Sequence, residues 1–184
     1  MPHQLLLPGL PPPPPLPPEC RAAREALRNY PKVPGHILSH YAKQLGTSGE
    51  LLFDSVMMRL GERSIPCAEH EAFDRILWLP QALVRVQIKT RHVMTHDSYV
   101  FDIKKGYRGG PTGTKSYNRS DFDILALIVL PESVIKFTAE WQNFHRIRMS
   151  EIQDLRKRPG ASFTQTLASM GLAEATRSGP PEPV

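Results

Sequence analysis

The chain has 184 residues, 40% of them hydrophobic, which suits one domain with a real core and flanking segments. Its net charge of +5 at pH 7 favours a polyanionic partner, nucleic acid first. Two cysteines without C-x-x-C spacing argue against a disulfide scaffold, and no apolar run approaches the roughly 20 residues that span a bilayer. We therefore expect no membrane partner and a reducing compartment, cytoplasmic or nucleoid-associated.

The two ends of the chain differ from its middle in composition. Nine of the 19 prolines fall within residues 1–18, and such a run has too few amide donors to join a helix or a sheet. Residues 1–20 are therefore predicted to be a disordered leader, with a docking site for a proline-reading partner as the alternative. Residues 158–184 are predicted to be a flexible tail that contains a short helix over 162–173. The folded domain is then 21–157.

The first part of this domain has helical patterns. Short helices are predicted over 21–30 and from Pro34 to a stop at Gly46. Thr47 followed by Glu50 fits the capping box S/T-x-x-E, and apolar residues at helical spacing predict a helix over 48–60. In this interpretation Glu50 is a capping residue, which is the alternative to a role in chemistry.

From residue 73 the apolar period changes to two, which indicates strands. Strands are predicted over 73–78, 83–90, 98–104, 124–130 and 134–138. Residues 106–115 read as a loop, 120–123 as one helical turn, and 141–156 as either a helix or a strand followed by a helix. This order predicts an α/β (α+β) fold with a central mixed β-sheet flanked by helices.

Four polar residues fall inside these predicted elements: Glu50, Asp74, Gln87 and Lys89. Asp is depleted from strands, and Gln87 and Lys89 share one face because they are two residues apart. If the strands at 73–78 and 83–90 form a hairpin, Asp74 lies beside Gln87 and Lys89. A helix that crosses the sheet can then bring Glu50 to the same end.

Such a cluster has the chemistry of phosphodiester hydrolysis. A hard divalent cation takes oxygen ligands, which Glu50, Asp74, the amide of Gln87 and the carbonyl of Ile88 can supply. The cation makes a bound water more acidic and neutralises a phosphoryl oxygen. Lys89 can orient or deprotonate that water, or hold the scissile phosphate.

The segments G-E-L-L, F-D-R-I and V-Q-I-K-T resemble the PD-(D/E)xK nuclease superfamily. More specifically, they are similar to its branch of archaeal Holliday junction resolvases and PD-(D/E)xK homing endonucleases, from about residue 49 to 137. The resemblance implies a nuclease-like domain with a restriction-endonuclease-like α-β-β-β-α-β core, here 47–138. It also implies an Mg²⁺-dependent or Mn²⁺-dependent DNA endonuclease that forms a dimer or tetramer, because cutting two strands needs two sites.

The resemblance assigns a role to each of the four residues. Glu50 matches the helix glutamate that assists metal binding, Asp74 the central metal aspartate and Lys89 the catalytic lysine. Gln87 falls at the second acidic position, where it removes one negative charge. Two interpretations stay open: an active site with weaker metal binding, or a catalytically inactive DNA-binding relative.

Basic residues in and around the loop form a predicted contact with nucleic-acid phosphates. They are Lys104, Lys105, Arg108, Lys115 and Arg119. The alternative is an ordinary solvated hairpin loop. A further alternative for the whole chain is a protein-interaction adaptor that uses the proline-rich leader.

Overall fold

The computed structural model describes residues 17–106 and 113–172, and the chain divides into two compact units after Tyr41. The first unit contains helix α1 (Pro18–Arg28) and helix α2 (Gly35–His40). Helix α1 begins inside the predicted leader, because a proline is well accommodated in the first turn of a helix. The rest of that leader lies outside the described residues. The second unit begins at residue 42, so the folded part is not one domain that starts at 21.

The second unit opens with an 18-residue helix, α3 (Ala42–Arg59). The helix break therefore lies at Tyr41 and not at Gly46, and the predicted capping box is wrong. Thr47 is inside the helix, where its Oγ1 donates to the carbonyl of Lys43 at 3.2 Å. A glycine inside a helix costs only about 1 kcal/mol, which the continuous hydrogen bonding of α3 outweighs.

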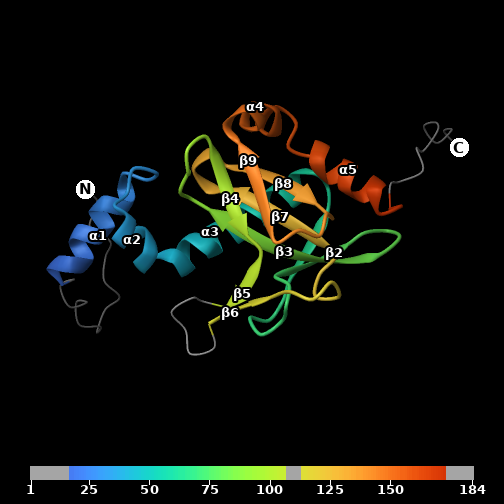
Figure 1. Cartoon of the computed structure of the whole chain (residues 1–184), viewed down its shortest axis with the longest axis horizontal. Helices are drawn as coiled ribbons and strands as arrows, with labels where there is room; N and C mark the ends of the chain where they lie inside the picture. The colour runs from blue at the N-terminus through green and yellow to red at the C-terminus, as the bar shows by residue number, and fades with distance from the viewer. Residues whose placement is uncertain (1–16, 107–112, 173–184) are drawn as a thin grey trace, which may run out of the picture. The chain divides into compact units, whose positions relative to one another are not determined.

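A five-stranded sheet forms the centre of this unit, in the order β1-β2-β3-β7-β8 (Figure 1). Its strands are β1 (Arg63–Pro66), β2 (Arg75–Trp78), β3 (Leu83–Arg91), β7 (Ile124–Val129) and β8 (Val134–Thr138). The pair β3–β7 is parallel and the other pairs are antiparallel. The predicted fold class, a central mixed sheet flanked by helices, is confirmed.

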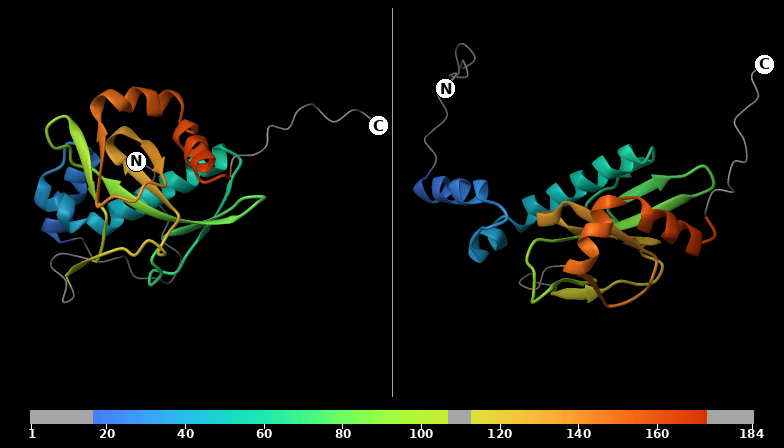
Figure 2. Two further views of the ribbon diagram at one scale, coloured as in Figure 1. Left: turned by 45° about the vertical axis from the view of Figure 1, so that its right-hand side comes forward. Right: turned by 90° about the horizontal axis from the view of Figure 1, so that it is seen from above.

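The sheet is covered on both faces, with α3 on one side and β4 with β9 on the other (Figures 1 and 2). Val84, Val86 and Ile88 of β3 belong to the apolar cluster under α3. Gln87 and Lys89 alternate with them and therefore point to the opposite face. All of β7 is buried, which confirms the expectation from its unbroken apolar run.

The second face is formed by elements that follow β3 and β8 in the chain. They are β4 (Ser98–Asp102), β5 (Lys104–Gly106), β6 (Thr114–Ser116), β9 (Phe144–Arg148) and α4 (Met149–Lys157). The 3₁₀ turn η1 (Leu130–Glu132) lies between β7 and β8, and its Leu130 packs against the cluster under α3. Strand β4 pairs with β9, and β5 pairs with β6 as a separate hairpin. For residues 141–156, the alternative of a strand followed by a helix is confirmed.

The predicted helical turn at 120–123 is wrong, because this segment is a non-helical turn. The side chain of Asp121 accepts from the Asn118 amide at 2.9 Å, and the Asp121 amide donates to the Asn118 carbonyl at 3.0 Å. Such side-chain bonds to the backbone compete with helix formation.

Helix α5 (Ala161–Ser169) closes the described part of the chain. Phe163 is buried in the cluster under α3, and Ser162 Oγ accepts from the Phe137 amide at 3.1 Å. The predicted flexible tail therefore does not begin at 158, although the short helix expected within it is present. Residues 173–184 lie outside the described part. Among residues 17–106 and 113–172, no helix has the length and apolar character needed to cross a bilayer.

Candidate active site

The β2–β3 hairpin brings Asp74 to Gln87, as its predicted pairing requires. Arg75 pairs with Val86, and the Asp74 amide continues the ladder by donating to the Val86 carbonyl at 2.9 Å. Asp74 Oδ2 then accepts from Gln87 Nε2 at 2.6 Å and from the Ile88 amide at 2.7 Å. Directly before β2 begins, the Asp74 side chain therefore accepts two hydrogen bonds from β3, which explains why an aspartate occupies this position.

Two oxygens converge on the side-chain amide of Gln87, which is only 5% exposed. Its Nε2 donates to Asp74 Oδ2 and, at 3.0 Å, to the Ile88 carbonyl. Reversal of the amide places its oxygen in the same position, since the two ends of an amide have nearly the same shape. The donor set is then one carboxylate, one main-chain carbonyl and one amide oxygen, which fits a hard divalent cation.

The charge of this donor set is low. Among the described residues, no group of three His, Cys, Asp or Glu side chains could hold a metal ion. Burial raises the pKa of Asp74, the nearby charge of Glu50 adds to this, and the hydrogen bond from Ile88 opposes it. A cation bound here would favour the ionised form of Asp74, because opposite charge offsets the cost of burial.

Glu50 lies at the same end of the hairpin, but it is paired with Arg75. Its Oε2 is 3.1 Å from Arg75 Nη1, and Asp54 Oδ2 is 3.0 Å from Arg75 Nη2. The same Nη1 donates to the Asp74 carbonyl at 2.8 Å. Arg75 thus joins two carboxylates of α3 to the backbone of the predicted metal aspartate. This role of Arg75 was not predicted. The signal in the sequence is that Arg75, a charged residue, shares a strand face with the buried Leu77 two residues away.

A glycine allows α3 to come this close to β3. A Cβ atom at Gly49 would lie 2.0 Å from Thr90 Oγ1, a distance at which one of the two must move. Gly49 is therefore needed for the contact between α3 and β3, and this contact fixes the position of the neighbouring Glu50 relative to β3.

Lys89 lies on the same face of β3 as Gln87, two residues further along the strand, and is largely withdrawn from solvent. Its Nζ donates to the Lys104 carbonyl and to Tyr117 Oη, each at 2.9 Å. Burial lowers the pKa of Lys89 to about 8, although the charges of Asp74 and Asp102 oppose this. Lys89 is thus within electrostatic reach of Asp74 without a hydrogen bond to it. The contact with Tyr117 was not predicted.

The predicted DNA-contacting lysines lie on or beside the β5–β6 hairpin. Lys104 is 3.4 Å from an oxygen of Asp102, and Lys105 is 2.8 Å from an oxygen of Asp121. Lys115 is exposed on β6. The hairpin therefore presents positive charge that is partly compensated by carboxylates of the same chain.

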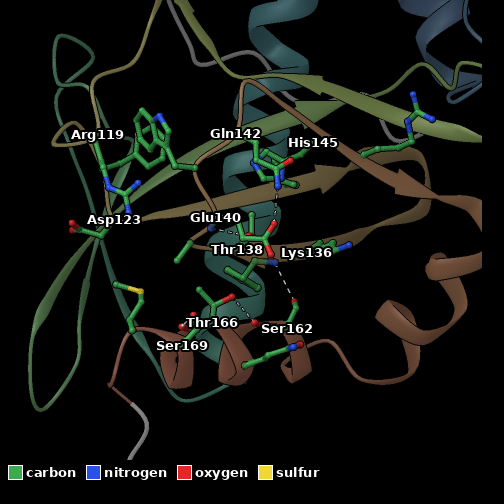
Figure 3. Close-up of a pocket in the computed structure, with 18 residues that line it drawn as sticks. Arg119, Asp123, Lys136, Thr138, Glu140, Gln142, His145, Ser162, Thr166 and Ser169 are labelled. Carbon is green, nitrogen blue, oxygen red and sulfur yellow. Dashed lines mark hydrogen bonds between the residues drawn. The ribbon is translucent and has the colours of Figure 1, made fainter.

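Arg119 lines a different feature, an open cavity of about 820 Å³ (Figure 3). Its other lining residues include Lys136 and Glu140 on or after β8, His145 of β9 and Ser162 of α5. The side chains of the Asp74 cluster do not line it, so the cavity is separate from the candidate active site. Arg108, the remaining predicted DNA contact, lies outside the described residues.

Comparison with solved structures finds a similar fold in a bacterial homing endonuclease. The endonuclease, I-Ssp6803I, matches with a TM-score of 0.50 and 13% sequence identity, and the match covers 65% of the present chain and 96% of the endonuclease chain. At such low identity the likeness concerns the fold alone. No protein family and no curated protein matches the sequence.

Proposed function

We propose that the chain is a metal-dependent DNA endonuclease of the PD-(D/E)xK type, which hydrolyses phosphodiester bonds. The observation that carries the proposal is the convergence of Asp74 Oδ2 and the Ile88 carbonyl on the amide of Gln87. Lys89 follows on the same face of β3. The fold of I-Ssp6803I supports it, since that protein is named an endonuclease.

Each residue has a distinct role in this proposal. Asp74, Gln87 and Ile88 hold Mg²⁺ or Mn²⁺ through a carboxylate, an amide oxygen and a carbonyl. The bound cation supplies a more acidic water and positive charge at a phosphoryl oxygen. The Lys89 ammonium stabilises the charge that develops on the phosphate. Glu50, paired with Arg75, acts on Asp74 through space and does not need to be a ligand.

DNA is the proposed partner, with phosphate contacts from the β5–β6 hairpin and a homo-oligomer that supplies one site for each strand. Lys115 is exposed on the described part of this hairpin, and the net charge of the chain is +5. Contacts between lysines and phosphates release counterions, so the affinity for DNA should fall steeply as salt is raised.

The test is cleavage of supercoiled plasmid, linear duplex and a four-way junction, with Mg²⁺, Mn²⁺ or EDTA. Cleavage should require the metal and should fall at least about 100-fold in Asp74→Ala and in Lys89→Ala, since the first removes a ligand of the cation and the second the charge that stabilises the phosphate. Asp97→Ala and Lys157→Ala are matched controls at exposed positions and should retain activity. Absence of cleavage on every substrate, or full activity in both site variants, contradicts the proposal.

The second candidate is a DNA-binding protein of the same fold without catalysis. The observation that favours it is that the Gln87 amide already satisfies Asp74 and Ile88 without a cation. This candidate predicts salt-sensitive DNA binding that is unchanged in Asp74→Ala, together with no cleavage in either metal.

A further inference from the structure

The two hydrogen-bond acceptors of the Lys89 ammonium lie at the base of the β5–β6 hairpin. Lys104 is the first residue of β5, and Tyr117 directly follows the last residue of β6. Lys104 and Ser116 are paired, so the acceptors sit on neighbouring positions of the two strands. The hairpin that carries the exposed Lys115 is thus joined at its base to the ammonium of Lys89.

Tyr117 contacts Lys89 in two ways. Its Oη accepts from Lys89 Nζ at 2.9 Å, and the centre of its ring is 4.8 Å from the same nitrogen. The ring itself is held by Phe122, which meets it edge-on with centroids 5.1 Å apart. A second cation also contacts the ring, since Lys105 Nζ lies 5.5 Å from its centre. Tyr117 therefore has a fixed orientation from which its hydroxyl can direct the ammonium.

We propose that Tyr117 is a positioning residue, which together with the Lys104 carbonyl holds the Lys89 ammonium against the base of the β5–β6 hairpin. The inference rests on the proposed function, because Lys89 is the residue assigned to the phosphate there. A lysine side chain is a flexible four-carbon stem with a compact charge, so its position is set by its acceptors. DNA that contacts the hairpin would then also contact the Lys89 ammonium, which is hydrogen-bonded to the base of the same hairpin.

Tyr117→Phe tests this role because it removes the acceptor and keeps the ring. Loss of one hydrogen bond to a charged group should lower kcat by about 10- to 100-fold while KM for DNA stays unchanged. Tyr99→Phe is the matched control, since it removes a hydroxyl from a buried tyrosine of the same apolar cluster, on β4. Wild-type kcat in Tyr117→Phe, or an equal loss in Tyr99→Phe, overturns the inference.

A second measurement does not depend on cleavage. The ¹⁵N–¹H signal of the Lys89 ammonium is recorded in metal-free protein at about pH 6 and is identified by its loss in Lys89→Met. Two oxygen acceptors should protect it from exchange in the wild type and in Tyr99→Phe, and it should broaden or disappear in Tyr117→Phe. If the wild type cleaves no DNA, the proposed function fails, and this signal alone decides whether Tyr117 holds Lys89. An unchanged signal in Tyr117→Phe overturns the inference whatever the cleavage assay gives.

Discussion

Gln87→Glu is the substitution that most directly probes the candidate metal centre. It replaces the Nε2 donor with an oxygen, 2.6 Å from Asp74 Oδ2 and 3.0 Å from the Ile88 carbonyl. A hydrogen bond to an ionised group is lost, which costs about 1.5–3 kcal/mol. Two buried carboxylates then repel each other, and uptake of a proton by one of them, which would restore a donor, itself costs free energy at neutral pH. In EDTA at neutral pH we expect the free energy of unfolding to fall by about 3 kcal/mol.

Magnesium should reverse much of this loss. The added carboxylate is a better ligand for a hard cation than an amide, and the cation removes the repulsion with Asp74. A ligand that binds only the folded state at 100 times its Kd contributes about 2.7 kcal/mol. The increase in the free energy of unfolding on addition of Mg²⁺ should therefore be larger in Gln87→Glu than in the wild type.

The assay is urea denaturation followed by circular dichroism, in EDTA and across a Mg²⁺ titration. Gln153→Glu, an exposed position on α4, is the matched control and should behave like the wild type in both conditions. Equal stability of Gln87→Glu and the wild type in EDTA would refute the contact between Gln87 and Asp74. No additional stabilisation by Mg²⁺ would refute the cation site while leaving the contact intact.

Two further predictions concern the elements around the site. Gly49→Ala should lower the free energy of unfolding by about 1–3 kcal/mol through overpacking against Thr90, whereas Gly46→Ala should raise it by about 1 kcal/mol. Equal effects of the two changes in urea denaturation would contradict the close approach of α3 to β3. A hydrogen bond from Lys105 lowers the pKa of Asp121, so the stability that its carboxylate contributes is present above its ordinary value near pH 4 and is lost as the pH falls through the lowered pKa. Asp121→Asn should therefore lose less stability between pH 5 and about 2 than the wild type, and an identical loss would count against the pair.

The parts of the fold that follow from alternation were predictable from the sequence. The strands around Val86 and Leu127 and the adjacency of Asp74 and Gln87 require only a period of two and a hairpin. Strand β1 was missed because its four residues are mostly exposed and show no alternation. The start of α3 was misplaced because the local stop signal at Gly46 is weak compared with a continuous helix.

Side-chain partners from distant segments could not be predicted in this way. The pairing of Glu50 with Arg75 depends on how α3 crosses β2, and the contact of Lys89 with Tyr117 depends on how the β5–β6 hairpin returns over β3. Neither of these contacts produces a periodic pattern in the sequence. The same reason applies to α5, which packs on the core through Phe163 and the partly buried Leu167.

The register of the β2–β3 hairpin has a consequence for recognising such sites in other chains. Asp74 and Gln87 are 13 residues apart because the turn at 79–82 is short and the strands between them are of equal length. Lengthening both strands by one residue would preserve the facing pair and change only the separation. A single insertion within one strand would instead send one of the two side chains to the opposite face of the sheet. The separation therefore measures the length of the hairpin, and the parity of an insertion decides whether an acid and an amide still meet.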